Sequence, residues 1–288
     1  MSTGTEHPAP IPESAAHPPP ALVPGPFAHA LSVGLGVVTV AAAAPTVLID
    51  DVLRGPAAMN GSARGTALVM LLVGVPLLVV GQLATRRDHG WALPIWLGST
   101  AYLLYNAFML LFATPFNALF LLYVGTFSLA LWTLVAILRV AEVAAFGRPG
   151  SPVGERRSIA VFTWVVVALN AAAWLRAIVN GLPDTAGAAF LQGTGLTTAP
   201  TYVQDLAVWL PLMAVAAYWL WRGLGWGYLV VASLLAMWVV ECITIAVDQY
   251  LGSIADPAAT MVSSSMTPLF VVLALVMAVP TVLLLRRM

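Results

Sequence analysis

The chain has 288 residues, of which 60% are hydrophobic and 8% are charged, and its mean hydropathy is +0.93. These values exclude an ordinary soluble domain and are typical of a membrane protein. The formal net charge is zero and lysine is absent, so the sequence has no basic patch of the nucleic-acid-binding kind, and we expect no nucleic-acid partner.

Residues 1–26 are rich in proline, alanine and serine. Such a composition cannot bury a core, so we predict a disordered tail that precedes a transmembrane domain over 27–288. Hydropathy then predicts helical segments that are each close to the ~20 residues needed to cross a bilayer. They cover residues 27–49, 65–84, 91–113, 116–139, 158–180, 204–222, 225–249 and 267–285. The predicted fold class is an all-α integral membrane protein, a polytopic bundle of about eight transmembrane helices.

Arginine placement predicts the orientation of this bundle in its partner, the lipid bilayer. The loops on one side carry nine arginines, against two on the other side and Arg176 within or at the end of the fifth span. The nine are Arg86, Arg87, Arg139, Arg148, Arg156, Arg157, Arg222, Arg286 and Arg287. Because cytoplasmic loops are enriched in Lys and Arg, we predict an integral plasma (inner) membrane protein with cytoplasmic N- and C-termini.

The chain resembles itself at an offset of 135 residues, which superimposes spans two and three on spans six and seven. The paired residues include Pro76 and Pro211, Arg87 and Arg222, and Trp91 and Trp226. One interpretation is two parallel four-helix repeats related by an axis along the membrane normal. The other is ordinary interface chemistry, since Arg and Trp are common at helix ends. The repeat predicts that Asn106 and Glu241 face each other at similar depth.

Polar side chains gather in the outer half of the predicted bundle. Glu241 lies inside the seventh span, where an ionisable group costs about 2.5–3.5 kcal/mol on insertion scales. A buried carboxyl group either holds a proton or finds a cation, and Arg176 is the only basic residue at comparable depth. We therefore expect Arg176 to pair with Glu241, Asp205 or both. The candidate substrate- or ion-binding residues are Glu241, Arg176, Asp205, Asn106, Asn117 and Asp248.

Cysteine and histidine are too few, or wrongly placed, for most metal and haem sites. Cys242 is the only cysteine, which excludes disulfides within the chain and thiolate metal cages. The histidines lie in the tail, at the edge of a span or in a loop, whereas haem held by two histidines needs imidazoles at membrane depth. We expect no metal and no cofactor.

Three functions fit this pattern. The leading hypothesis is a small transporter-like protein with a proton- or ion-responsive polar site and a small-molecule or ion substrate. The second is a non-catalytic membrane subunit or scaffold, in a homo- or hetero-oligomer, whose polar cluster is structural. The third is a membrane-embedded enzyme that acts on a lipid or lipid-linked substrate. It would use Glu241 or the acidic pair Asp50 and Asp51, which resembles the first-loop acids of polytopic glycosyltransferases. A P-loop, HExxH and GxSxG are all absent, which makes the enzyme less favoured.

Overall fold

The computed structural model describes residues 24–141, 153–183 and 188–288, and every regular element in these ranges is helical. Eight helical segments in this part of the chain are long and apolar enough to cross a membrane, which confirms the polytopic all-α fold. The predicted disordered tail lies almost wholly outside the described residues.

The first four spans come from the N-terminal half of the chain. Their elements are α1 (Pro26–Leu48), η1 (Asp50–Val52), α2 (Ala57–Val69), η2 (Met70–Gly74), α3 (Val75–Thr85), α4 (Ala92–Phe112) and α5 (Phe120–Leu138). Helices α2 and α3, with η2 between them, make one continuous span.

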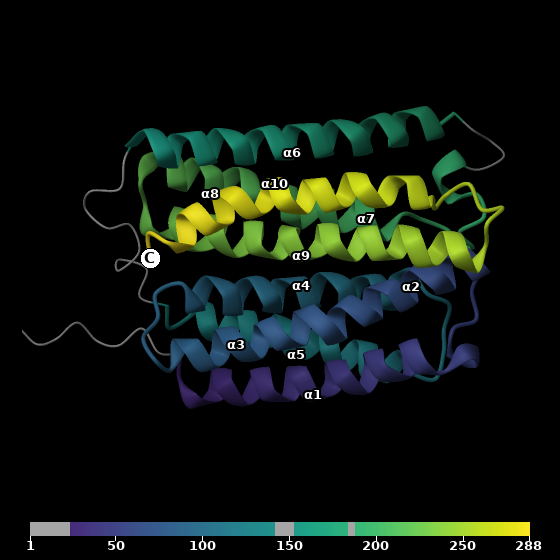
Figure 1. Cartoon of the computed structure of the whole chain (residues 1–288), viewed down its shortest axis with the longest axis horizontal. Helices are drawn as coiled ribbons and strands as arrows, with labels where there is room; N and C mark the ends of the chain where they lie inside the picture. The colour runs from purple at the N-terminus through teal and green to yellow at the C-terminus, as the bar shows by residue number, and fades with distance from the viewer. Residues whose placement is uncertain (1–23, 142–152, 184–187) are drawn as a thin grey trace, which may run out of the picture.

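The last four spans repeat this plan. Their elements are α6 (Val153–Gly181), η4 (Ala189–Leu191), α7 (Pro200–Gln204), η5 (Asp205–Trp209), α8 (Leu210–Arg222), α9 (Gly225–Ala255), η6 (Ser264–Met266) and α10 (Thr267–Leu285). Here α7, η5 and α8 form one span. The two groups of helices lie on either side of a plane, and α4 and α9 run beside it (Figure 1).

The predicted spans differ from the observed ones mainly at their outer ends. The second span begins at Ala57 and the seventh ends at Ala255, because small and polar residues there lower the hydropathy without breaking the helix. Helix α5 begins at Phe120 instead of residue 116. The cause is Asn117, whose Oδ1 accepts the Leu119 N–H at 2.9 Å and whose Nδ2 donates to the Pro115 carbonyl at 3.1 Å, closing a turn before the helix.

Glycines allow α2 to approach α9 closely, and this contact joins the two halves. A Cβ atom at Gly65 would lie 2.5 Å from Asp248 Oδ1 and 3.0 Å from the Asp248 backbone nitrogen. A Cβ atom at Gly61 would lie 2.6 Å from the Leu251 carbonyl oxygen. Small residues at such contacts allow helices to associate in lipid. Association there gains little from the hydrophobic effect, because lipid tails are as apolar as the side chains.

Two π-helical segments occupy equivalent places in the two halves. Segments η2 and η5 begin 135 residues apart, at Met70 and Asp205, and each is followed by a proline at the second residue of the next helix. Proline has no N–H and crowds the carbonyl group four residues earlier, and the extra residue of a π-bulge relieves this conflict. The shared irregularity supports the internal duplication.

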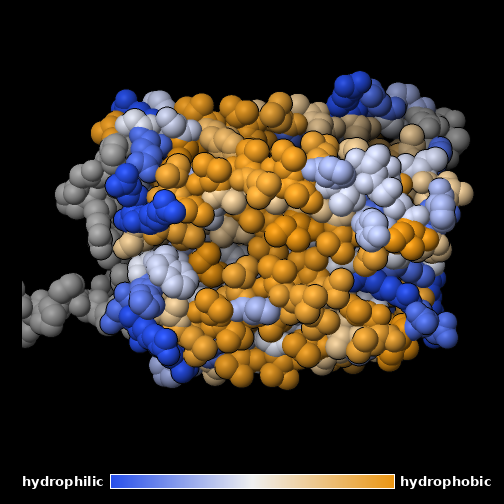
Figure 2. All heavy atoms as spheres, viewed as in Figure 1, coloured by the Kyte–Doolittle hydropathy of each residue, from blue (hydrophilic) through white to orange (hydrophobic). Residues whose placement is uncertain are grey.

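The surface has an apolar belt between two polar ends (Figure 2). Because the spans alternate in direction, one end collects the arginines that follow α3, α5, α8 and α10 and those that begin α6. We call this the arginine-rich end. The C-terminus lies there, at the left in Figure 1. The alternation agrees with the predicted grouping of the described arginines.

Candidate functional site

The central group of the candidate site is the carboxyl group of Glu241, next to the midpoint of α9. Its side chain is 4% exposed, and Oε2 accepts a hydrogen bond of 2.8 Å from Asn106 Nδ2 on α4. The same two helices also meet through the hydroxyl groups of Tyr102 and Thr244, which are 2.8 Å apart. The expectation that Asn106 faces Glu241 is confirmed, and the α4–α9 contact is polar at its centre.

Asp205 is the second acid, and it begins the π-helical segment η5. Its side chain is 1% exposed, and Oδ2 accepts the indole N–H of Trp174 from α6 at 2.8 Å. Its Oδ1 is buried without a hydrogen-bond partner among the described residues. The hydroxyl group of Tyr105 lies beside the side chains of Asp205 and Gln204. Asp205 therefore sits where α4, α6 and η5 meet.

Asp248 is the third acid, two turns along α9 from Glu241. Its Oδ2 accepts a hydrogen bond of 2.9 Å from the Thr66 hydroxyl on α2. The Ser62 hydroxyl donates to the Asp248 backbone carbonyl at 3.2 Å. The Oδ1 atom of Asp248 is buried with no partner in the described part of the chain. The glycine contact described above places this carboxyl group between α2 and α9.

We call Asp205, Glu241 and Asp248 the carboxyl row. Glu241 is the middle member, because Asp248 lies two turns away on α9, while Asn106, which bonds Glu241, directly follows Tyr105, whose hydroxyl lies beside Asp205. In the described ranges the ion pairs are Arg64 with Asp50 at 2.9 Å and Arg287 with Glu155 at 2.8 Å, and neither includes a member of the row. The row therefore consists of two buried acids and one half-buried acid, and none has a described basic partner.

The predicted ion pair of Arg176 with Glu241 or Asp205 is wrong. Arg176 is exposed on α6 and makes no ion pair with either acid. Trp174, two residues earlier, projects toward the bundle and donates to Asp205 instead. An arginine beside lipid gains more from extending its guanidinium to the polar interface than from crossing into the bundle.

Asn117 also lies apart from the carboxyl row. It is 4% exposed, and both of its amide atoms bond within the turn that precedes α5. Asn117 is therefore buried because it closes this turn. Of the six predicted site residues, the structure thus brings together Asn106, Asp205, Glu241 and Asp248 and leaves Arg176 and Asn117 outside.

Unpartnered polar atoms gather around Tyr105. The buried atoms without a described hydrogen-bond partner include Asp205 Oδ1, Gln204 Nε2 and Trp238 Nε1. The Trp238 ring is 5.9 Å from the Tyr105 ring, centroid to centroid. Buried polar groups in proteins are nearly always satisfied, so the free donors and acceptors here are an unusual feature of the site.

Sequence reasoning missed Tyr102, Tyr105 and Trp174. The first is one helical turn before Asn106 and so shares its face, a signal that was present in the sequence. Trp174 gave no signal, because a tryptophan inside a span is usually a packing residue. In the described residues, no group of three or more His, Cys, Asp or Glu side chains is arranged to hold a metal ion.

No known protein family, curated protein or solved structure matches this chain. The assignment of a function therefore rests on the carboxyl row and on the surfaces around it.

Proposed function

We propose that this protein is a small membrane transporter whose carboxyl row takes up and releases protons or a monovalent cation. The observation that carries this proposal is that Asp205 and Glu241 are buried, and Asp248 is partly buried with a buried Oδ1, without a basic partner among the described residues. Three neighbouring negative charges at membrane depth would repel each other at high cost, so protons or bound cations must neutralise them. Amides and hydroxyls can join helices with a smaller free-energy cost of burial than carboxyl groups, so a purely structural contact does not need acids.

The position of each acid supports exchange along the row. Because neighbouring carboxylates repel each other in a medium of low dielectric constant, neutralising one acid should change the affinity of the next for a proton or cation. Glu241 also bonds Asn106 across the α4–α9 contact, so its charge affects the junction of the two halves. Transporters commonly place coupling sites at such a junction. The arginine-rich end faces the cytoplasm in this proposal.

The test is the access of water to Glu241. In a Cys242→Ser background, Glu241→Cys and Met237→Cys are prepared in turn and treated with a membrane-impermeant maleimide. We expect labelling of Glu241→Cys in the folded protein, because an exchanging carboxyl group needs an aqueous path. Met237 lies one turn closer to the arginine-rich end on α9, so its labelling shows how far that path extends.

Two matched variants calibrate this labelling. Thr133 on α5 is fully buried away from the row, so Thr133→Cys is the dry control, and Ser265, an exposed residue of η6, gives the fully accessible control Ser265→Cys. Gel filtration and circular dichroism establish that each variant is folded. Labelling of Glu241→Cys no faster than Thr133→Cys would mean a dry row and would end the transport proposal.

One observation favours a second function, that of a non-catalytic subunit held together by the row. Each acid accepts a hydrogen bond from a different partner helix: Asp205 from α6, Glu241 from α4 and Asp248 from α2. A dry result in the labelling experiment would support this function. The enzyme alternative has no comparable support, since Asp50 is a surface acid paired with Arg64.

A further inference from the structure

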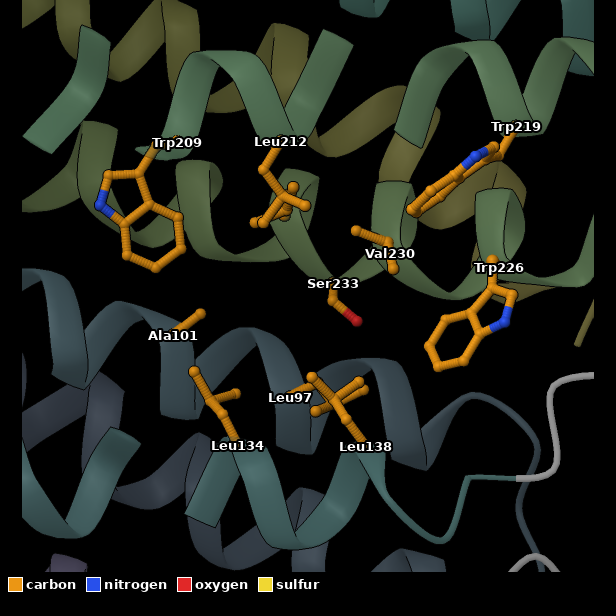
Figure 3. A pocket seen from close by; sticks show the side chains of 11 residues that line it. Leu97, Ala101, Leu134, Leu138, Trp209, Leu212, Trp219, Trp226, Val230 and Ser233 are labelled. Carbon is orange, nitrogen blue, oxygen red and sulfur yellow. The ribbon is translucent and has the colours of Figure 1, made fainter. Parts of the chain in front are cut away.

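A cavity of about 360 Å³ lies between the two halves, and its lining includes no member of the carboxyl row. Helices α4 and α5 form one wall and the η5–α8 span and α9 form the other, and Figure 3 shows their side chains pointing toward one another across the space. Its lining residues include Leu97, Ala101, Leu138, Trp209, Trp219 and Trp226. A cavity of this size is in the range that binds small molecules or single chains.

The lining accepts hydrocarbon and little else. Its hydroxyl group, on Ser233, already donates to the Leu229 carbonyl at 2.8 Å. The indole N–H of Trp209 points away to Gln204 Oε1, at 3.2 Å. A polar ligand would lose its hydration here without gaining partners. The chemistry of the lining therefore favours a flexible apolar chain.

The cavity begins at one membrane surface and reaches toward mid-depth. Leu138 and Trp226, at one end of it, are the last residue of α5 and the second residue of α9, both at the arginine-rich end. Trp209, at the other end, is ten residues before Trp219 along the span, which corresponds to about 15 Å of helix. Every lining residue belongs to a membrane-spanning segment, so lipid is the medium outside.

Two exposed arginines stand at the surface end of this cavity. Arg139 directly follows Leu138, and Arg222 ends α8 three residues after Trp219. Arg222 donates to the Tyr218 hydroxyl at 3.0 Å, and neither arginine pairs with a carboxylate among the described residues. Basic groups between transmembrane helices at the membrane surface attract anionic headgroups. The position of positive charge beside an apolar channel matches a molecule with a negative head and an apolar chain.

We propose that this cavity binds an anionic phospholipid of the bilayer, with one acyl chain between α4, α5, α8 and α9 and the phosphate headgroup at Arg139 and Arg222. The chain fills the apolar volume that the protein leaves open. The headgroup would supply a negative charge for the two arginines, which pair with no carboxylate in the described part of the chain. This site is separate from the carboxyl row, and its existence does not depend on transport.

Photo-crosslinking of the unmodified protein tests the position of the chain. The protein is reconstituted with a phosphatidylglycerol that carries a diazirine near the end of one acyl chain, irradiated and mapped by mass spectrometry. We expect crosslinks to cavity residues such as Leu97, Leu212 and Val230. Crosslinks confined to outward faces, such as Val271 and Leu275 of α10, would overturn the proposal.

Native mass spectrometry tests occupancy with a cavity-filling variant. Figure 3 shows the Ala101 methyl group facing the cavity, so Ala101→Phe fills it, and we expect at least about tenfold less retained phosphatidylglycerol. Val271→Phe also introduces a phenylalanine, but on a lipid-facing surface, and this variant should retain as much lipid as the unmodified protein. Equal retention by Ala101→Phe, or no retention by the unmodified protein, would contradict the proposal.

The headgroup is tested by competition between lipids with matched chains. The unmodified protein should retain phosphatidylglycerol in preference to phosphatidylcholine. The double variant Arg139→Gln with Arg222→Gln should lose this preference while still retaining a lipid. An unmodified protein without preference would overturn the assignment of an anionic lipid.

Discussion

The Asn106 amide is the closest partner of Glu241, and it makes two hydrogen bonds with one nitrogen. Asn106 Nδ2 donates to Glu241 Oε2 at 2.8 Å and to its own helix, at the Tyr102 carbonyl, at 3.2 Å. The second bond fixes the direction of the first. A donor held in this way orients the carboxyl group in the middle of the carboxyl row, so Asn106 is a positioning residue for the proposed exchange.

Replacing Asn106 by leucine should destabilise the protein by about 1–2 kcal/mol, since it leaves a buried carboxyl oxygen without its donor. Cys242 supplies the measurement: it is the only cysteine and is 6% exposed, so a fluorogenic maleimide reports its unfolding on heating. We expect a lower midpoint temperature for Asn106→Leu.

Thr133→Val is the control for this prediction. The Thr133 hydroxyl is buried without a described partner, and valine has nearly the same shape. Removing an unpartnered hydroxyl should leave the midpoint unchanged or raise it slightly. A midpoint for Asn106→Leu equal to that of the unmodified protein would show that the bond to Glu241 adds no stability.

At the scale of helices, the contact of α2 with α9 depends on glycine. Gly61 and Gly65 are one turn apart on α2, and both meet the backbone of α9. At Gly65 the neighbour is Asp248, so the same contact that joins the halves also positions one end of the carboxyl row. Helix packing and site geometry are therefore determined by the same residue.

Gly65→Ala should separate the two helices. Its methyl group would lie 2.5 Å from Asp248 Oδ1, and the backbone nitrogen 3.0 Å away leaves no room to shift. Overpacking of this kind costs about 1–3 kcal/mol, measured by the same cysteine assay. Gly154→Ala on α6 is the matched control, because its methyl group would meet nothing within 4 Å. Equal midpoints for the two variants would show that the α2–α9 contact is loose.

The helices themselves were largely predictable, because apolar runs of bilayer length need no tertiary information. The π-helical segments were not: Pro76 and Pro211 indicate a local conflict, but whether a kink, a break or a bulge resolves it depends on neighbouring helices. Depth alone suggested that Arg176 would pair with Glu241. Which residue of α6 reaches the acids depends on the face of the helix that points inward, and this face carries Trp174.

At the scale of the whole molecule, the halves share a plan but carry different chemistry. The residues equivalent to Asp205, Glu241 and Asp248 at the 135-residue offset are Met70, Asn106 and Ala113. All three acids thus belong to the second half, and the first half contributes the donors to Glu241 and Asp248, namely Asn106 and Thr66, while Trp174 of the second half donates to Asp205. If the halves arose by duplication, their divergence produced one site at the junction in place of two.

The uneven distribution of arginine predicts the direction in which the molecule crosses the membrane. His89 is exposed between α3 and α4 at the arginine-rich end, and Ser265 is exposed in η6 at the opposite end. In a Cys242→Ser background, an impermeant maleimide added to intact cells should label Ser265→Cys and not His89→Cys. After the cells are opened, both should react. The reason is the arginine count, since positively charged loops are retained in the cytoplasm.

The reverse pattern would place the arginine-rich end outside, and Asp248 would then be near the cytoplasmic surface. Labelling of both variants in intact cells would mean that the protein inserts in two orientations.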